Sequence, residues 1–336
     1  MIPLIEVSPA GPKNRTGSRH DRTNPPEKRR IDTFFKGCPF RPFMGKITVV
    51  GAGRLGSTIA FSIMKERVAD ELVIIDIIEN LVQGEGLDLG QTCLCPVIGS
   101  TDYSNIEGSD LIISVAGIAR KPDMTREQLL GTNAKIMRSV AEQIVRYAPD
   151  ALVLVVANPM DAMTYIALKE TGFPPDRVFG MRGVVDTNRF RYFLAREFGI
   201  PVEEVKAMVV GQHGEVMIPL ASSVRIGGEV PDPARVERAV ARTKDAGREV
   251  IALKGATFYA PAHATALMVR AIMEDRREVT PASVLIEEED VCLGMPIVLG
   301  RGGVLEVLEP EMTDDEREQF RRAAAALREN LSAVGY

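Results

Sequence analysis

The string GAGRLG at residues 51–56 constrains the fold of this chain more than any other feature. It stands between the β-branched run ITVV and a helical pattern that continues to about residue 67. In such a turn Gly51 allows a tight bend, Gly53 lets the backbone approach a pyrophosphate, and Gly56 lets helix and strand pack closely. The N–H groups and the dipole of the helix N-terminus favour anions. The string therefore predicts a strand, a turn and a helix that bind a dinucleotide.

An acidic residue at the end of the next strand supports this prediction. Asp76 closes the β-branched run at 72–76 and follows Gly56 by 20 residues. A carboxylate at that place hydrogen-bonds the ribose hydroxyls of adenosine. Since it also repels a 2′-phosphate, it favours NAD over NADP. With Arg54 and Leu55 inside the turn, these residues form the predicted cofactor site; a helix-capping turn with an incidental aspartate is the alternative.

Strand and helix patterns alternate along the first half of the chain. Predicted strands lie at residues 46–50, 72–76, 110–116, 151–157 and 177–180. Helical patterns separate them, with a clear one at 132–147. This alternation predicts parallel βαβ units with right-handed crossovers. We therefore expect an α/β fold in which residues 44–181 form a Rossmann-type, doubly wound parallel sheet that binds NAD.

After about residue 181 the pattern changes. Helical patterns lie at 186–199 (DTNRFRYFLAREFG) and near 233–253. Short strand patterns lie at 206–210, 220–226, 284–286, 296–299 and 303–307. The chain closes with a helix, for which Thr313 is the predicted N-cap and Glu316 completes a capping box. Residues 182–336 are thus predicted to form an α+β substrate domain with an antiparallel sheet.

The first 43 residues differ from the rest in composition. They hold nine Lys or Arg and four Asp or Glu, are rich in Pro, Gly and Arg, and show no period. We expect a disordered basic leader, with a targeting peptide as the alternative. Because the whole chain has a net charge of −5 and the leader contributes +5, residues 44–336 carry −10. So acidic a body disfavours nucleic acid, whose nonspecific binding requires cations that neutralise phosphates.

Other compositional features exclude a membrane span and a disulfide framework. No apolar run approaches the ~18 residues needed to cross a bilayer, and the best, ALVLVVA at 151–157, is typical of a buried strand. Four cysteines in 336 residues are too few for a disulfide scaffold, so we expect a reducing cytoplasm. Cys93 and Cys95 form a lone C-x-C without further soft ligands nearby, and no metal site is expected.

Five charged or titratable residues in two stretches indicate the chemistry of the site. Arg120 and Arg126 lie in RKPDMTR, Asp186 and Arg189 in DTNR, and His213 in GQHGE. Three guanidinium groups beside an aspartate-supported imidazole fit a small substrate with two carboxylates and one hydroxyl or carbonyl. An imidazole, with an ordinary pKa of about 6.5, can exchange protons near neutrality. Residues 117–131 around the first two arginines lack a clear period and are predicted to form a movable loop bracketed by Pro122 and Gly131.

Six strings between residues 46 and 330 resemble the lactate/malate dehydrogenase family, and its malate dehydrogenase branch more closely. They are GAGRLG, VAGIARKPDMTREQLLGTNAKI, VANPMDAMTY, GVVDTNRFRYFLA, QHGEVMIPL and KGATFYAPA, in the family's order. The resemblance implies two domains, reversible hydride transfer between (S)-malate and NAD⁺ giving oxaloacetate and NADH, and a homodimer or homotetramer. The leader lies outside it.

The resemblance also implies roles for individual residues. His213 would accept and return the hydroxyl proton, and Asp186 would hold the far nitrogen of its imidazole. Arg189 would clamp the C1 carboxylate, and Arg126 would polarise the reacting carbonyl. Polar contacts to the substrate hydroxyl and the cofactor are expected from Asn158 and Asn133.

Arg120 decides the expected substrate. By resemblance it pairs with a second carboxylate, whereas lactate enzymes have an uncharged residue there. With pyruvate, Arg120 would lie unpaired in a closed pocket, at a cost of roughly 2–5 kcal/mol. An L-lactate or other 2-hydroxy acid dehydrogenase is the alternative, and an NAD-using glycosidase or a non-catalytic NAD scaffold belongs to another class. The chain departs from the family at Gln212 and Glu215, which puts the rate in doubt more than the reaction.

Overall fold

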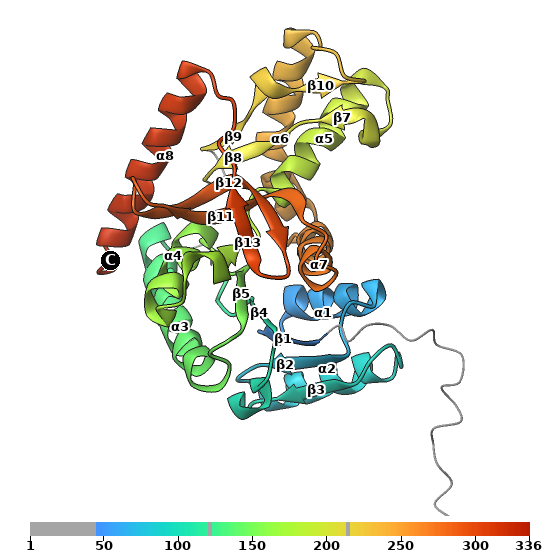
Figure 1. Cartoon of the computed structure of the whole chain (residues 1–336), viewed down its shortest axis with the longest axis vertical. Helices are drawn as coiled ribbons and strands as arrows, with labels where there is room; N and C mark the ends of the chain where they lie inside the picture. The colour runs from blue at the N-terminus through green and yellow to red at the C-terminus, as the bar shows by residue number, and fades with distance from the viewer. Residues whose placement is uncertain (1–44, 120–122, 213–215) are drawn as a thin grey trace, which may run out of the picture. The chain divides into compact units, whose positions relative to one another are not determined.

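Six parallel strands form the first part of the sheet in the computed structural model, which describes residues 45–119, 123–212 and 216–336 (Figure 1). The strands are β1 (Lys46–Val50), β2 (Glu71–Ile75), β3 (Val97–Ser100), β4 (Leu111–Ser114), β5 (Leu152–Val155) and β6 (Val178–Gly180). Their order is β3-β2-β1-β4-β5-β6, which is the doubly wound Rossmann order. The predicted fold class is confirmed, while the predictions for residues 1–43, Arg120 and His213 lie outside the described residues.

Helices cover both faces of these strands, as their near-continuous apolar sequences require. The helices of this half are α1 (Arg54–Glu66), α2 (Glu79–Gly90), α3 (Arg126–Tyr147) and α4 (Met160–Thr171). One core cluster packs residues of α1 and α2 against the sheet, and a second packs residues of α3 and α4 against its other side. In Figure 1, α3 lies beside α4 and away from α1.

Helix α2 and strand β3 lie in a region where the sequence patterns predicted no element. Helix α2 contains the internal glycines Gly84 and Gly86, which weaken any helical pattern. The structure gives a reason for the second one. A Cβ on Gly86 would stand 2.8 Å from the backbone nitrogen of Gly99 in β3, so the helix approaches the strand backbone closely.

The predicted loop at 117–131 is partly wrong, because helix α3 begins at Arg126 and Gly131 lies within it. The helix starts six residues before the predicted residue 132. Its N-cap Thr125 and residue Gln128 form a complete capping box, in which Gln128 N donates to Thr125 Oγ1 at 3.1 Å. Gly131 therefore does not bracket a movable segment, and Pro122 lies outside the described residues.

The second half extends the same sheet with antiparallel strands. They are β8 (Val209–Gly211), β9 (Met217–Pro219), β11 (Glu278–Ile286), β12 (Val291–Gly300) and β13 (Gly303–Val307). Strand β6 pairs with β11 through Gly180 and Ser283, and the order continues through β12, β8 and β9, with β13 on β12. The predicted antiparallel sheet is confirmed, although β11 and β12 are longer than the patterns indicated. The predicted strand at 220–226 is only partly correct. Its first part is a 3₁₀ turn (Ala221–Ser223), and only β10 (Arg225–Ile226) is a strand, which pairs with β7 (Val205–Lys206).

Four helices complete the second half: α5 (Val184–Phe198), α6 (Pro233–Lys254), α7 (Tyr259–Met273) and α8 (Asp314–Ser332). Apolar residues of α5 and α6 form a third core cluster with β7, β8 and β9. Thr313 and Glu316 make the predicted capping box of α8. The predicted apolar face of α8 is buried at Phe320, Ala324, Leu327 and Leu331, whereas Val334 follows the helix and is half-buried. Among the helices of the described ranges, none is long and apolar enough to span a membrane.

Candidate active site

The glycine turn between β1 and α1 is packed against the sheet at two positions and open at a third. Gly51 has a φ of +111°, and a Cβ there would lie 3.0 Å from the backbone nitrogen of Ala116. A Cβ on Gly56 would stand only 1.8 Å from the carbonyl oxygen of Gly51, so only glycine lets α1 approach this closely. Gly53, the N-cap of α1, has no atom within 4 Å of its Cβ position. This free space lies where a phosphate approaches in a dinucleotide-binding turn.

Asp76 follows β2 and its carboxylate is anchored beside the glycine turn. Its Oδ2 accepts a hydrogen bond from Ala52 N at 2.7 Å, and its Oδ1 accepts one from Ile78 N at 3.0 Å. Burial of Tyr103, and secondarily the charge of Asp76, raises the pKa of that phenol to about 12. The neighbouring phenol therefore stays a neutral hydroxyl near the carboxylate. The turn, the free space at Gly53 and this fixed carboxylate fit the phosphates and ribose of a dinucleotide.

Two asparagines join the segments that follow β4 and β5. Asn133 of α3 is buried; its Oδ1 accepts from Ile118 N at 2.9 Å, and its Nδ2 donates to Ile118 O at 3.2 Å and to Asn158 O at 2.6 Å. Asn158 itself is exposed at the carboxyl end of β5, the edge where open α/β sheets bind ligands. Asn133 therefore fixes the backbone of this edge, and contact with a cofactor stays a prediction for both residues.

The remaining predicted binding residues of the first half lie at helix starts. Arg54 is the first residue of α1, with its guanidinium carbon 5.4 Å from the ring centre of Phe258. Leu55 packs against the first core cluster. Arg126 is exposed at the first position of α3, where the capping box of Thr125 fixes the backbone.

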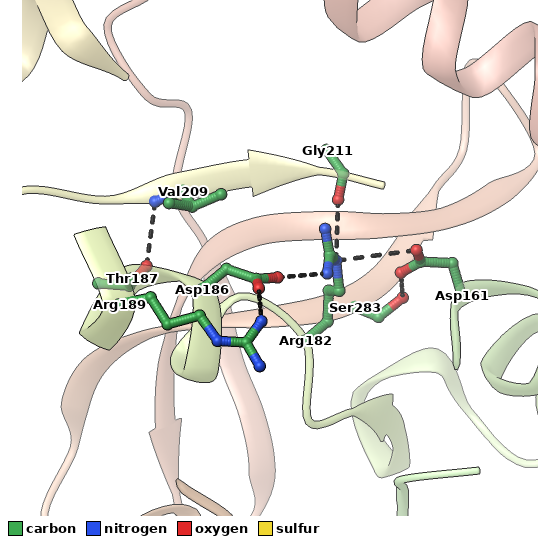
Figure 2. Close-up of polar contacts among 8 residues, drawn as sticks. All are labelled: Asp161, Arg182, Asp186, Thr187, Arg189, Val209, Gly211 and Ser283. Carbon is green, nitrogen blue, oxygen red and sulfur yellow. Dashed lines mark hydrogen bonds and ion pairs between the residues drawn. The ribbon is translucent and has the colours of Figure 1, made fainter. Parts of the chain in front are cut away.

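Asp186 and Arg189 are brought together in the first turns of α5, as Figure 2 shows. Arg189 Nη1 donates to Asp186 Oδ1 at 3.0 Å, and the arginine side chain is 13% exposed whereas the aspartate side chain is 2% exposed. A Cβ on Gly247 of α6 would stand 3.3 Å from Arg189 Nη1, so a glycine there lets the guanidinium lie against the helix. The buried carboxylate of Asp186 therefore fixes the guanidinium of Arg189, and part of that guanidinium remains exposed.

A buried arginine that the sequence analysis did not single out holds the other side of Asp186 (Figure 2). Arg182 Nη1 donates to Asp186 Oδ2 at 2.7 Å, and Arg182 Nε donates to the carbonyl oxygen of Gly211 at 3.1 Å. The same Nε lies 3.7 Å from Asp161 Oδ2, and Ser283 Oγ donates to Asp161 Oδ1 at 2.8 Å. One signal did exist in the sequence: Arg182 is the only charged residue in the apolar run FGMRGVV.

The strand that precedes His213 in the sequence ends beside the cluster of Arg182, Asp186 and Asp161. Strand β8 ends at Gly211, whose carbonyl Arg182 binds, and Val209 N in the same strand donates to Thr187 Oγ1 at 3.0 Å. His213 follows Gly211 by two residues in the sequence. Arg120 and His213 themselves lie outside the described residues. Within the described part of the chain, no group of three or more His, Cys, Asp or Glu is arranged to hold a metal ion.

The doubly wound sheet, the glycine turn and the anchored carboxylate together define a Rossmann-type dinucleotide-binding protein. Residues 45–180 match the lactate/malate dehydrogenase NAD-binding domain, and residues 184–335 match the α/β C-terminal domain of the same proteins. The chain belongs to the lactate/malate dehydrogenase family. The resemblance stated from the sequence strings is confirmed, and with it NAD as the cofactor.

Relatives and solved structures agree with this assignment over most of the chain. Malate dehydrogenase of Thermomicrobium roseum is 42% identical over 303 residues, covering 86% of this chain and 98% of that protein. The structure of malate dehydrogenase from Salinibacter ruber has a TM-score of 0.81 and 39% identity, covering 86% of this chain and 97% of its own. A lactate dehydrogenase of Cryptosporidium parvum, solved with lactic acid and NAD, has a TM-score of 0.82 and 33% identity, covering 86% and 98%.

Proposed function

We propose that this protein catalyses the reversible oxidation of (S)-malate by NAD⁺ to oxaloacetate. The observation that carries the proposal is the Asp186–Arg189 pair, in which a buried carboxylate fixes a guanidinium that is still partly exposed. A planar guanidinium held this way can bind a substrate carboxylate through two parallel hydrogen bonds. The relatives named malate dehydrogenase, at about 40% identity over both domains, support the choice of a dicarboxylate.

The chain's own residues would bind the substrate, orient it and move one proton. Arg189 would hold the C1 carboxylate and Arg120 the second carboxylate, while Arg126 would stabilise charge developing on the reacting oxygen. Asn158 would orient that oxygen. His213 would accept the hydroxyl proton during oxidation and return it during reduction, with Asp186 holding the imidazole.

The cofactor site is proposed in the glycine turn and at the adjacent strand ends. When bound, NAD supplies the ring that accepts or donates the hydride. The turn residues Gly51, Gly53, Arg54, Leu55 and Gly56 would hold the pyrophosphate, and Asp76 would hold the adenosine ribose. Asn133 and Asn158 would border the nicotinamide end, since they meet at the carboxyl edge of β4 and β5.

The deciding experiment compares oxaloacetate with pyruvate in an NADH-oxidation assay. The wild-type protein should prefer oxaloacetate. Arg120→Gln should lose roughly thirty-fold to several-thousand-fold of that preference, because the variant has no guanidinium that pyruvate would leave without a carboxylate partner. Lys121→Gln, which removes the neighbouring cation, is the matched control and should keep the preference. An Arg120→Gln protein with an unchanged preference would favour a lactate or other 2-hydroxy acid dehydrogenase, which the Cryptosporidium parvum structure keeps as the second candidate.

We further propose a two-domain enzyme, residues 44–181 and 182–336, that works as a homodimer or homotetramer in the cytoplasm. Large apolar side chains on α1 and α2 support self-association, because Phe61 is 44% and Leu87 is 67% exposed. Light scattering after gel filtration should give two or four copies of the 36.7 kDa chain. A monomer at assay concentration would reject the oligomer.

A further inference from the structure

The most deeply buried cation in the described part of the chain is the guanidinium of Arg182. Its side chain is 2% exposed and lies in the turn between β6 and α5. It contacts two carboxylates from different helices, Asp161 of α4 and Asp186 of α5, and the last carbonyl of β8. Its Nη2 is buried and has no hydrogen-bond partner among the described residues. Burying a guanidinium costs desolvation free energy, which its carboxylate and carbonyl partners must offset.

The strongest contact of Arg182 is with the carboxylate that the proposed mechanism assigns to the imidazole. Arg182 Nη1 is 2.7 Å from Asp186 Oδ2, and Arg189 Nη1 is 3.0 Å from Asp186 Oδ1. Each carboxylate oxygen has two lone-pair directions, so these bonds leave acceptor capacity on Asp186. The two arginines also partly neutralise the negative charge of Asp186, so a further donor interacts with a weaker net charge.

We propose that Arg182 is a positioning residue for Asp186 and that its charge lowers the pH range in which the proton carrier of the site works. The inference rests on the proposed pairing of Asp186 with His213. Arg182 fixes the carboxylate from the side opposite Arg189 and anchors β8 two residues before His213. Because the cation at 2.7 Å compensates the carboxylate, an imidazolium beside Asp186 is stabilised less than it would be beside an aspartate without that partner.

The other groups around Arg182 do not cancel this effect. Asp161 from α4 is farther from Nε, at 3.7 Å, and is itself held by Ser283 of β11. Strand β12 contributes Gly294, which gives Arg182 room, and the thiol of Cys292 in the same strand is under the influence of Asp161. Burial, followed by the charge of Asp161, raises the pKa of Cys292 well above its usual value, so the thiol stays neutral. Helix α5 contributes Arg189, helix α6 contributes Gly247 beside it, and β8 contributes only the Gly211 carbonyl.

The sign of the effect follows from the proton balance. Oxaloacetate reduction takes one proton from the imidazolium, so its rate falls as the pH rises through the titration midpoint of that group. Removing the Arg182 cation leaves Asp186 more negative and should raise this midpoint. With Arg182→Met we expect the midpoint to move up by roughly one pH unit. Arg182→Lys keeps a charge but loses the planar fork, so it should lower kcat while leaving the midpoint near that of the wild type.

Histidine-labelled protein read by NMR measures the midpoint without any substrate. The chain has three histidines, so His20 and His263 serve as internal controls whose midpoints should not differ between variants. The pH dependence of kcat/KM for oxaloacetate is measured on the same proteins. Arg177→Met is the matched control, because Arg177 also binds a backbone carbonyl, that of Pro149, but lies at the opposite end of β6. It should change neither midpoint.

Each result decides between the inference and the proposed function. A folded Arg182→Met protein whose His213 midpoint equals the wild-type value overturns the inference, as does an equal shift in Arg182→Lys. If stranding Asp161 prevents folding, Arg182→Met with Asp161→Asn carries the same test, and its midpoint should still rise. A shifted midpoint in a protein that does not reduce oxaloacetate refutes the substrate while keeping the electrostatic role. Turnover of oxaloacetate with unshifted midpoints rejects only the role of Arg182.

Discussion

At the scale of single residues, two glycines in one turn have opposite surroundings. Gly56 leaves no room for a side chain, with its Cβ position 1.8 Å from a backbone oxygen, whereas Gly53 faces open space in an extended conformation. Packing explains the first glycine completely. No packing contact requires a glycine at residue 53, and the need for free space beside a bound ligand explains it.

Replacing these two glycines with alanine should therefore separate folding from cofactor binding. Gly56→Ala should destabilise the protein by at least 1–3 kcal/mol, roughly the cost of overpacking a core, because α1 must move off β1. Gly53→Ala should keep the melting temperature but weaken NADH binding. Thermal melting and titration of NADH fluorescence measure the two effects. Gly53→Ala protein with wild-type NADH affinity would contradict the proposed approach of a phosphate at this position.

Asp76 allows a second test at this scale. Its carboxylate is held by two backbone N–H groups beside the turn, so it cannot swing away from a 2′-phosphate. Asp76→Ser should relax the preference for NADH over NADPH by about tenfold or more, since two unit charges about 4 Å apart interact by roughly 1–4 kcal/mol near a protein surface. The comparison is the ratio of kcat/KM for the two cofactors. Glu79→Ser, which removes an exposed acid three residues later, should leave the ratio alone.

At the scale of secondary-structure elements, two matched capping boxes begin helices in the described part of the chain. Thr125 and Gln128 begin α3, whose first residue is Arg126, and Thr313 and Glu316 begin α8. In both, the threonine hydroxyl accepts a hydrogen bond from the backbone N–H three residues later. The same local chemistry thus stands next to the proposed site in one helix and is part of the ordinary packing of another.

Alanine at each cap should give equal losses of stability but unequal losses of activity. Each of Thr125→Ala and Thr313→Ala should cost about 1 kcal/mol, the usual value of an N-cap. Thr125→Ala should also reduce kcat/KM for oxaloacetate, because a frayed first turn misplaces the guanidinium of Arg126. Denaturant unfolding and steady-state kinetics are the measurements. Equal kinetics for the two variants would argue against a role of Arg126 in the site.

The elements also show what local sequence can and cannot predict. Strand β1, strand β13 and the cap of α8 were predicted correctly, because β-branched runs and capping boxes are short-range signals. The patterns missed α2 and β3, whose glycines are explained only by the approach of Gly86 to Gly99. Among site residues, spacing from the glycine turn indicated Asp76, while the DTNR string and the family resemblance indicated Asp186 and Arg189. Motif spacing did not indicate Arg182, because its partners Asp161 and Gly211 are distant in sequence and meet only in the fold.

At the scale of the whole molecule, one turn residue links the two halves. Asp290 lies between β11 and β12 and accepts hydrogen bonds from Tyr165 and Lys169 of α4 and from Arg328 of α8. Burial raises the pKa of this carboxyl, but the hydrogen bonds and charges of its partners outweigh burial and lower the pKa below its usual value. The carboxylate is thus stabilised as an anion in the folded protein.

The lowered pKa of Asp290 predicts how stability depends on acid. A carboxyl group whose pKa is lower in the folded than in the unfolded protein stabilises the fold at pH values above its ordinary pKa. That stabilisation is lost as the pH falls through the lowered pKa of the folded protein. Asp290→Asn should therefore lower the melting temperature at pH 7, and the difference from the wild type should shrink below about pH 4. Asp315→Asn, an exposed acid on α8, is the control. A difference that persists undiminished at acid pH would mean that packing, not charge, explains the loss.

The pairing of Gly180 with Ser283 makes the cofactor strands and the substrate strands one continuous sheet. A hinge between the halves would have to bend or break hydrogen-bonded strands, and a sheet resists that far more than a flexible linker does. Any opening that admits substrate must then be confined to short connecting segments. Asn158, just after β5, and Asp186, in the first turn of α5 just after β6, then keep a constant separation through the catalytic cycle.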